Sequence, residues 1–299
     1  MTVDVGIIGS VNHDITVFTA RHPRPGETVL GTGHRSGGGG KGANQAVAAA
    51  RLGGATALIA RLGDDEQGRA LLSSLDKEGI DVEGVSVDHT SPTGLAVITV
   101  DEQAENSIVV SPGANMTLGP EHVRVYGETL SRVKVAVAQL EIPIETVAAA
   151  ARTVSGMFVL NPAPAQELPP ELLQLVDILV PNRSELATLS GAEELGDRKQ
   201  IAQAARMIER PSAVIVTLGS EGALVVNKDQ EIHVSPPQVD PVDTTGAGDA
   251  FCGALAVALS EDRDLVEAAE FAALAGGLAT TRHGAQEAMP TRADMEARR

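Results

Sequence analysis

The sequence is poor in aromatic residues, and this shortage argues against two classes of function. It has no Trp, one Tyr and four Phe among 299 residues, so aromatics make up only 2% of the chain. Recognition of nucleic-acid bases relies on stacked aromatic rings, and membrane interfaces are rich in Trp and Tyr. We therefore expect neither kind of recognition, and we expect a core built from Ala, Val, Leu and Ile.

Basic residues and cysteine are scarce as well. The chain has 23 basic and 40 acidic residues and a formal net charge of -17. Such a surface repels nucleic acids and anionic membranes, so an anionic substrate such as ATP must be held by local donors and a metal ion. The single cysteine, Cys252, excludes an internal disulfide and suits a reducing compartment.

Long apolar runs and a secretory signal are also missing. No apolar run reaches the roughly 18 residues that a membrane span requires. Residues 1–11 lack the basic region of a signal peptide and carry Asp4. We therefore expect a cytoplasmic protein with no membrane partner. At this length we expect residues 1–299 to form a single domain.

The apolar pattern predicts an α/β fold. A short apolar strand is predicted at residues 3–8, and from residue 55 onward predicted strands alternate with predicted helices. The later strands are 55–60, 82–87, 135–139, 157–160, 177–180 and 213–217, and the helices are 45–52, 65–78, 121–132, 144–155, 183–189 and 199–209. This alternation predicts a three-layer α/β/α arrangement, with helices on both faces of a mainly parallel central sheet.

Two segments interrupt that alternation. Residues 15–36 and 93–110 show no helical period, and each is predicted to form an antiparallel strand pair. Together they predict a small β-sheet lid over the site, from about residues 13–36 and 93–112. A small sheet with an apolar face needs cover, so we expect a homodimer that forms through the lid.

The strongest chemical signal is a turn of small residues that runs into an apolar helix. The turn consists of Gly246, Ala247 and Gly248, and the helix is predicted over 254–259. At a helix N-terminus, unpaired backbone N–H groups and the helix dipole bind a negative charge. Asp249 lies beside that site. The pair suits phosphoryl transfer, because the donors hold the transferring group while the carboxylate takes a proton from the attacking hydroxyl. The alternative is an Asp that only complements the dipole, which contributes about 0.3–1 kcal/mol.

A run of glycines before the first predicted helix has three interpretations. The spacing of Gly37, Gly39 and Gly42 matches the dinucleotide-binding fingerprint, but no buried strand precedes it. The Walker phosphate-loop pattern does not match, because Arg35 stands where its first Gly belongs and Gly42 where its Ser or Thr belongs. We favour a ligand loop in which the backbone approaches a ligand closely and Lys41 and Asn44 point toward it.

Polar residues follow several predicted strands, on the side where ligands bind in open α/β sheets. Asn12 and Asp14 follow the first strand, and Glu141 follows the strand 135–139. Asn and Asp also favour turns for local reasons, and for Asn12 and Asp14 alone we prefer the turn interpretation.

Two further strand ends allow a functional and a structural interpretation. Asn182 and Glu185 match a helix capping box, and they also suit the water shell of a nucleotide-bound Mg2+. The glycine turn at 217–222 suits a nucleotide ribose or base edge, and a plain β-turn explains it equally well.

Taken together, these motifs resemble the ribokinase-type family of carbohydrate kinases over nearly the whole chain. The resemblance rests on two long motifs, Gly39–Ala46 near the start and Asp243–Asp249 near the end. Three shorter segments add to it: Asn182–Glu185, Leu160–Ala165 and Thr281–Gln286. It implies the ribokinase-like fold and ATP-dependent phosphorylation of a sugar.

The resemblance also implies a role for each matching residue around the sugar. Asp249 would be the base that deprotonates the sugar's primary hydroxyl, and the amides of Gly246, Ala247 and Gly248 would form the anion hole. The residues that would contact the sugar are Asn12, Asp14, Gly40, Lys41, Gly42, Ala43, Asn44, Glu141 and Asp249, with Ala96 and Ile98 from the lid.

On the nucleotide side, the resemblance implies ATP, Mg2+ and a monovalent cation, K+. Asn182 and Glu185 would hold the Mg2+–phosphate shell through water. The nucleotide pocket would be lined by Thr217, Leu218, Gly219, Ser220, Glu221, Gly222, Gly248, Asp249 and Ala273. The positions that match the K+ site are Asp243, Thr245, Ala279, Arg282, Gly284 and Ala288. Ala288 stands where family members often carry a Ser, so one hydroxyl ligand to that cation is missing. Ala273, near the expected adenine pocket, replaces a larger polar residue of some relatives.

The leading hypothesis is ATP-dependent phosphorylation of D-ribose at its primary hydroxyl, which gives D-ribose 5-phosphate. A kinase acting on another sugar or nucleoside (deoxyribose, fructose or adenosine) is the alternative in the same class. An NAD(P)-dependent dehydrogenase that uses Gly37, Gly39 and Gly42 is the alternative from another class. A sugar-binding sensor on a kinase scaffold would lack the base, and the presence of Asp249 argues against it.

Overall fold

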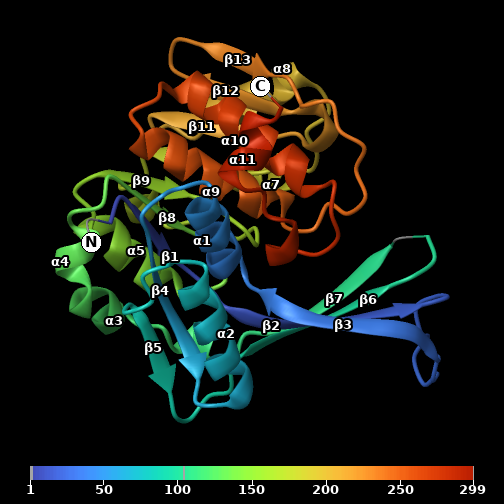
Figure 1. Cartoon of the computed structure of the whole chain (residues 1–299). Helices are drawn as coiled ribbons and strands as arrows, with labels where there is room; N and C mark the ends of the chain where they lie inside the picture. Colours follow the sequence, from blue (N-terminus) through green and yellow to red (C-terminus); the bar gives the residue numbers. More distant parts are fainter. Residues whose placement is uncertain (1–2, 104, 299) are drawn as a thin grey trace.

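A computed structural model describes residues 3–103 and 105–298, and its main feature is a nine-stranded sheet (Figure 1). The strand order is β13-β12-β11-β10-β9-β8-β1-β4-β5. The strands are β1 (Val5–Ile8), β4 (Thr56–Gly63), β5 (Val85–Asp88), β8 (Val135–Ala138), β9 (Met157–Leu160), β10 (Ile178–Leu179), β11 (Ala213–Thr217), β12 (Ala223–Asn227) and β13 (Glu231–Val234). All neighbouring pairs from β5 to β11 run parallel, which confirms the mainly parallel sheet.

The edge hairpin of this sheet, β12 and β13, is absent from the sequence-based prediction. Both strands pair antiparallel, β12 with β11 and β13 with β12. The chain reverses from β11 into β12 at Gly222, whose φ is +88° and where a Cβ would lie 2.1 Å from the Val234 carbonyl oxygen. Only glycine fits there, so this residue permits the tight return of the chain.

Helices cover both faces of the sheet and form the three predicted layers. One face is covered by α1 (Lys41–Arg51), α2 (Glu66–Lys77), α9 (Ala247–Ser260), α10 (Leu265–Ala279) and α11 (Arg292–Glu296). The other face is covered by α3 (Pro120–Val125), α4 (Gly127–Leu130), α5 (Ile144–Thr153), α6 (Pro170–Leu173), α7 (Arg183–Ser190) and α8 (Arg198–Met207). Successive strand residues point to opposite layers, since Ile7 packs in the first cluster and Ile8 in the second.

One predicted helix is divided in the structure. The sequence predicts a helix over 121–132, whereas α3 and α4 meet at Tyr126. Three short 3-10 helices complete the described chain: η1 (Gly113–Thr117), η2 (Gly219–Glu221) and η3 (Gln286–Ala288).

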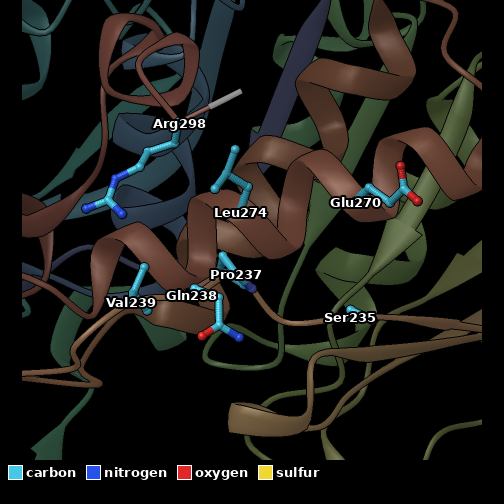
Figure 2. A pocket seen from close by; sticks show the side chains of 7 residues that line it. All are labelled: Ser235, Pro237, Gln238, Val239, Glu270, Leu274 and Arg298. Atoms are coloured by element: carbon cyan, nitrogen blue, oxygen red, sulfur yellow. The ribbon is translucent and has the colours of Figure 1, made fainter.

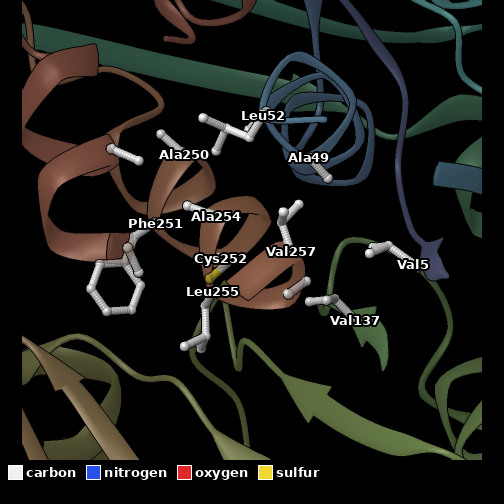
Figure 3. Packing of buried hydrophobic residues seen from close by; sticks show 14 of the residues in the cluster. Val5, Ala49, Leu52, Val137, Ala250, Phe251, Cys252, Ala254, Leu255 and Val257 are labelled. Atoms are coloured by element: carbon white, nitrogen blue, oxygen red, sulfur yellow. The ribbon is translucent and has the colours of Figure 1, made fainter. Parts of the chain in front are cut away.

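The small residues of α9 let it pack closely against α1 (Figure 3). Ala250 and Ala254 lie on the side of α9 that faces Ala49 and Leu52 of α1 (Figure 3). A Cβ at Gly253 would lie 2.6 Å from the Gln45 carbonyl oxygen, so a larger residue would push the two helices apart. This close approach brings the N-terminal turns of α1 and α9 together.

The smaller sheet is the predicted lid, and it projects from the body of the molecule (Figure 1). Its order is β3-β2-β6-β7, with β2 (Asn12–Thr19), β3 (Gly31–Gly39), β6 (Gly94–Val100) and β7 (Asn106–Ser111). The two predicted antiparallel pairs are present, and β2 and β6 join them in parallel. Ala104, within the predicted lid segment, lies outside the described residues.

The lid strands extend further toward the body than the sequence predicts. Gly37 and Gly39 belong to β3, and Asn12 and Asp14 belong to β2, where Asn12 pairs with Gly39. The ligand loop and the turn expected at these positions are therefore strand ends. Long-range pairing between the two segments overrides their local turn preference.

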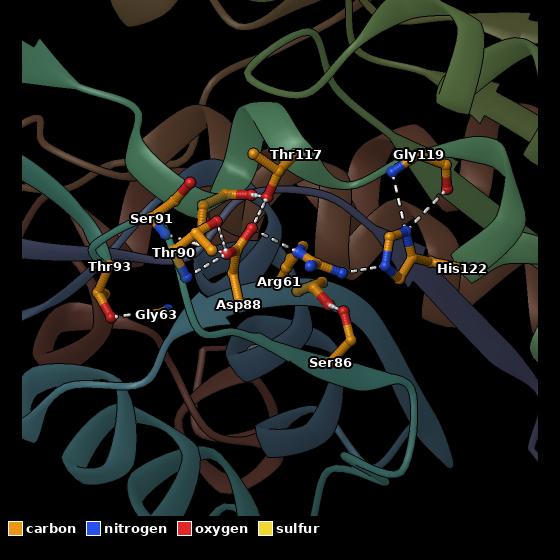
Figure 4. A network of polar contacts seen from close by, with 12 residues as sticks. Arg61, Gly63, Ser86, Asp88, Thr90, Ser91, Thr93, Thr117, Gly119 and His122 are labelled. Carbon is orange, nitrogen blue, oxygen red and sulfur yellow. Dashed lines mark hydrogen bonds and ion pairs between the residues drawn. The ribbon is translucent and has the colours of Figure 1, made fainter.

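A polar network fixes the root of the lid to the body (Figure 4). Asp88 accepts hydrogen bonds from the hydroxyls of Thr117 (2.6 Å) and Thr90 (2.7 Å) and from Arg61 Nε (3.1 Å). These donors, with the Thr117 hydroxyl foremost, hold the pKa of the Asp88 carboxyl well below its usual value. Asp65 accepts from the backbone N–H of Thr93 (2.8 Å), just before β6. The chain thus enters the lid from an anchored segment.

In the part of the chain that the structure describes, none of the helices is both long enough and apolar enough to cross a membrane.

Candidate active site

The candidate site lies where two helices begin at the carboxyl ends of the central strands. Gly40 precedes α1 with φ +85°, and Gly246 precedes α9 with φ +74°. A Cβ at Gly40 would lie 2.8 Å from the Asn12 backbone nitrogen, so glycine allows the start of α1 to contact the start of the lid. The two glycine motifs are distant in sequence, and the fold brings them to one place.

Asp249 is buried, and a side-chain amide contacts each of its carboxylate oxygens. Asn44 Nδ2 donates to Oδ2 at 2.9 Å, and Gln45 Nε2 donates to Oδ1 at 3.1 Å. The sequence predicted Asp249 and Asn44 as site residues and missed Gln45. A glutamine within the apolar run of α1 is the signal that could have identified it.

Lys41 carries its ammonium group among several carboxylates. The attraction of Asp249, followed by that of Glu141 and Glu185, raises the pKa of the Lys41 ammonium above its ordinary value. The Lys41 backbone N–H also donates to Glu141 Oε2 at 3.1 Å, and the Ser10 hydroxyl donates to the same oxygen. The structure therefore brings Lys41, Glu141, Glu185 and Asp249 together and places Ser10 beside them.

Asp14 occupies an unfavourable position for a charged carboxylate. Burial raises its pKa to about 7, and repulsion from Glu141, Glu287 and Asp249 adds to the effect. Its Oδ1 is buried without a hydrogen-bond partner among the described residues. A Cβ at Gly39 would lie 2.0 Å from its Oδ2, so the neighbouring strand must carry glycine.

Asn12 is held in one orientation by a residue that the sequence analysis missed. Asn115, in η1, donates from Nδ2 to Asn12 Oδ1 at 2.7 Å. Asn115 Oδ1 in turn accepts from the Val11 N–H at 2.9 Å, which fixes the direction of the Asn115 amide. Because Asn12 Oδ1 is occupied, its NH2 group is the part left to donate to a ligand.

The lid residues lie at different depths. In the β2–β6 pairing, Ala96 is the register partner of Asp14 and is buried, whereas Ile98 is the partner of Thr16, further out along the lid. Ala96 therefore lies nearer the site than Ile98.

The turn before Asp249 differs in detail from the predicted anion hole. The Ala247 N–H donates to the Thr244 carbonyl at 3.2 Å, so this amide is already used within the turn. No hydrogen-bond partner is found for the Gly248 N–H among the described residues. A Cβ at Gly248 would meet no atom within 4 Å, which means that the turn borders open space. An anion could approach this helix N-terminus.

Three of the predicted monovalent-cation positions, Asp243, Thr245 and Gly284, lie together near this turn. Asp243 accepts from the N–H groups of Thr245 (2.9 Å) and Gly284 (3.0 Å). Burial favours the neutral carboxyl, but these hydrogen bonds outweigh it and hold the pKa of Asp243 below its usual value. The Arg282 side chain turns away and binds Asp294 at 2.9 Å, and Ala288 is fully buried.

Asp243 supplies carboxylate oxygens at this turn, and oxygen ligands suit hard cations. Within residues 3–103 and 105–298, no group of three or more His, Cys, Asp and Glu side chains is placed to hold a metal ion.

Asn182 and Glu185 form the capping box that the sequence allows. Asn182 Oδ1 accepts from the Glu185 N–H at 2.8 Å, and Glu185 Oε2 accepts from the Asn182 N–H at 2.8 Å. Burial raises the pKa of the Glu185 carboxyl. Carboxylate oxygens have further lone pairs, so the cap is compatible with a water shell around Mg2+.

The predicted nucleotide segment leads from β11 into η2. Leu218 donates to the Gly222 carbonyl at 2.8 Å, and Glu221 pairs with Arg183 at 2.7 Å. Gly219 has φ +60°, and a Cβ there would meet no atom within 4 Å. The segment is therefore a tight turn with an open side, and Ser220 lies at its exposed tip.

A cavity of about 400 Å³ lies against α10, and it is not lined by the predicted Ala273 (Figure 2). Ala273 is buried, whereas the next residue, Leu274, faces the cavity. The lining residues are Ser235, Pro237, Gln238, Val239, Glu270, Leu274 and Arg298.

The dinucleotide interpretation does not fit the structure. Gly37 and Gly39 lie within β3 of the lid, whereas the fingerprint requires a turn that follows a sheet strand and opens a helix.

Comparison with known proteins gives one consistent result. The family model described as pfkB family carbohydrate kinase matches residues 4–292. The chain is 38% identical to the ribokinase of Haemophilus influenzae over 291 residues, which cover 96% of this chain and 95% of that protein. It is 36% identical to the deoxyribokinase of Salmonella typhimurium, covering 97% and 96%. It spans about half (54%) of a 40% identical bifunctional ribokinase/ribose-5-phosphate isomerase A of Fructilactobacillus sanfranciscensis, with 96% of this chain covered.

The solved structure of Arabidopsis thaliana ribokinase complexed with ribose and ATP superposes with a TM-score of 0.91 at 34% identity. That alignment covers 99% of this chain and 98% of the plant chain. These matches extend over nearly the whole chain, including the glycine motifs, Asp249 and the lid. The protein therefore belongs to the pfkB family of carbohydrate kinases.

Proposed function

We propose that this sugar kinase transfers the γ-phosphoryl group of ATP to the primary 5-hydroxyl of D-ribose and so forms D-ribose 5-phosphate. The observation that carries the proposal is the buried Asp249 carboxylate beside the open Gly248 turn at the start of α9. A base next to an anion-binding helix terminus is what phosphoryl transfer to an alcohol requires. Several relatives are named ribokinase, and one of them joins this activity to a ribose-5-phosphate isomerase.

Unpaired polar atoms in the site favour a ligand rich in hydroxyl groups. Asp14 Oδ1 and Asn44 Oδ1 are buried acceptors without a partner among the described residues. The Asn12 amide group and the Lys41 ammonium are donors in the same region. A buried acceptor without a partner is unfavourable, so a sugar hydroxyl that donates to it would stabilise the complex.

In the proposed mechanism, residues of α1 and α9 act together around the reacting atoms. Asp249 accepts the proton of the 5-hydroxyl while the sugar oxygen forms a bond to the γ-phosphorus. The bond from phosphorus to the bridging oxygen breaks, and ADP leaves. The helix dipole and the Gly248 N–H, with the turn of Gly246 and Ala247, stabilise the negative charge on the transferring group. Lys41 supplies positive charge close to the base.

Two cations complete the proposal. Asn182 and Glu185 would hold water molecules around Mg2+, which neutralises phosphate charge when it is bound. The loop of Asp243, together with carbonyl oxygens such as that of Gly284, would hold K+. Because Ala288 has no side-chain hydroxyl, we expect weaker K+ dependence than in relatives with a Ser there. The nucleotide would lie along the turn at 217–222.

We also propose that the whole chain acts as one unit and that two copies associate through the lid in the cytoplasm. The outer part of the lid exposes apolar side chains, among them Ile108, Val109 and Val110. An exposed apolar patch on a small sheet favours a partner surface, and a second copy offers the same patch. Sedimentation equilibrium of the full chain should give twice the monomer mass, and a monomer at all concentrations would contradict this part.

A panel of acceptors tests the substrate assignment. Coupled measurement of ADP release with Mg2+, with and without K+, should give the largest kcat/KM for D-ribose among D-ribose, deoxyribose, fructose and adenosine. Deoxyribose is the second candidate, because one relative of 36% identity is named deoxyribokinase. Much faster turnover of another acceptor would overturn the assignment to D-ribose.

A further inference from the structure

A chain of buried amides reaches Asp249 from the central sheet. Gln45 is fully buried and uses both N–H bonds of its amide, one to Asp249 Oδ1 at 3.1 Å and one to Asn161 Oδ1 at 3.3 Å. Its own oxygen accepts from Gln139 Nε2 at 2.6 Å. Asn161 Nδ2 donates to the Val180 carbonyl at 2.9 Å. These contacts connect α1 and α9 to the ends of β8, β9 and β10.

The backbone carbonyl of Val180 fixes the direction of every hydrogen bond in this chain. A carbonyl can only accept, so the NH2 group of Asn161 must face it and the Asn161 oxygen must face Gln45. Gln45 must therefore point its NH2 group toward Asn161 and Asp249. The opposite orientation of Gln45 would place its oxygen against two other oxygens. The sheet thus dictates that Asp249 receives an N–H at Oδ1.

This arrangement is costly if its role is only to fill the core. Gln139 Oε1 is buried without a hydrogen-bond partner among the described residues. A polar cluster with an unmet acceptor is less favourable than apolar residues of the same volume. The contact with Asp249 is what apolar residues could not supply.

We propose that Gln45 is a positioning residue for the catalytic carboxylate, an inference that rests on the proposed role of Asp249 as base. With Asn44 at Oδ2 and Gln45 at Oδ1, the carboxylate cannot rotate, and each oxygen keeps a lone pair for the substrate proton. Gln45 has no exposed surface and so does not touch the sugar. It acts on the reaction through Asp249 alone, by holding the carboxylate in one orientation.

The test replaces Gln45 by Met, which has a similar length and no N–H donor. We expect kcat to fall roughly 10- to 100-fold while KM for D-ribose and for ATP stays within about 3-fold, because the base is misplaced and the binding groups are intact. The acid limb of the kcat–pH profile should move to higher pH, since the ionised base loses a hydrogen bond. Gln45→Glu keeps the shape but adds a like charge, so its acid limb should move further.

Gln139→Met is the matched control. It makes the same chemical change in the same cluster and leaves the Gln45 N–H on Asp249. We expect a comparable loss of melting temperature, kcat within about 3-fold of the parent and an unmoved acid limb. The other titratable groups that face Asp249 are Asp14 from β2, Lys41 from α1, Glu185 from α7 and Cys252 from α9 itself. These four groups are the same in all variants, so their titration cannot cause a difference between the variants.

Each outcome decides one point. An unchanged kcat and acid limb in Gln45→Met, or equal effects of Gln45→Met and Gln139→Met, would overturn the positioning role. If Asp249→Asn is inactive in the same assay, Asp249 remains the base even then. Comparable turnover of Asp249→Asn would instead overturn the proposed base, and the role of Gln45 with it. Should D-ribose be a poor acceptor, the assays use the best acceptor of the panel.

Discussion

The central sheet and the lid differ in how much of their apolar surface the chain itself covers. Every residue of β1 and β8 is buried between two helical layers. In contrast, every residue of β7 is exposed, and Val109 has 69% of its surface accessible. The site lies where the two sheets meet. The central sheet and its helices position Asp249, Glu141 and Glu185, whereas the lid contributes Asn12 and Asp14.

This difference implies a division of tasks between the two regions. Groups on the packed helices can be held to a fixed geometry, as the chemical step requires. Strands with few covering contacts are the ones that open locally, as substrate entry requires. Changes near the central sheet should therefore lower turnover or stability, and changes in the lid should weaken sugar binding or cause little loss of stability.

The largest effect is expected for Asp249→Asn on α9. The amide keeps the shape but cannot accept the proton, so kcat should fall by about 10²- to 10⁴-fold while affinity for sugar and ATP remains near normal. Steady-state kinetics with equilibrium binding of both substrates measure this. Turnover close to that of the parent would show that the base is misassigned and that the two regions do not divide the tasks as described.

A large loss of stability is expected for Phe158→Ala in β9. Phe158 is among the largest fully buried side chains, and its removal leaves a cavity in the packed sheet. Such truncations cost about 3–5 kcal/mol in free energy of unfolding. Urea denaturation of the full chain gives the value, and a cost below about 1 kcal/mol would mean that the central sheet is less tightly packed than the structure shows.

Asp14→Asn at the base of the lid should affect binding and stability in opposite directions. Loss of the carboxylate acceptor should raise KM for the sugar roughly 10-fold or more. At high pH the same substitution should increase the stability of the folded protein. Because the pKa of Asp14 is raised to about 7 from 3.8, the folded protein binds more protons than the unfolded chain between these values, and stability falls as pH rises through that window.

The Asp14→Asn variant has no carboxyl group at this position, so it lacks this pH-dependent loss of stability. Its melting temperature relative to the parent should therefore be higher at pH 8 than at pH 5, by about 2–4 °C or more. Thermal unfolding of both proteins without ligand at the two pH values measures the difference. An equal difference at both pH values would contradict the raised pKa and the strained placement of Asp14 that it reflects.

The smallest effect is expected for Val109→Thr on the exposed lid strand. Threonine keeps the branched shape and the preference for a strand, and little surface is buried to lose. The free energy of unfolding should change by less than about 0.5 kcal/mol. Urea denaturation at low protein concentration, where a dimer is dissociated, provides the value. A loss similar to that of Phe158→Ala would show that the lid is packed as firmly as the central sheet.

Local patterns in the sequence predict the alternation of strands and helices and both glycine motifs. They make Asp249, Asn44 and Lys41 candidate site residues, because small residues and helix starts leave a recognisable signal. They do not predict the parallel contact of β2 with β6 or the edge hairpin β12–β13, which depend on pairing between strands.

Gln45, Gln139, Asn161 and Asn115 were missed for a related reason. Each acts through hydrogen bonds to residues far away in the chain, and no spacing rule connects Gln45 with Asp249. A glutamine within an alanine-rich helix is the one local sign of this cluster. Only the packing of α9 against α1 shows what it contacts.

A crystal structure with D-ribose and a non-hydrolysable ATP analogue tests the central claim most directly. The proposed mechanism predicts that the sugar 5-oxygen lies about 2.6–3.2 Å from an Asp249 carboxylate oxygen and that the γ-phosphate lies against the turn of Gly246 and Gly248. A sugar whose 5-oxygen lies far from Asp249, or a triphosphate that ends away from this turn, would contradict it.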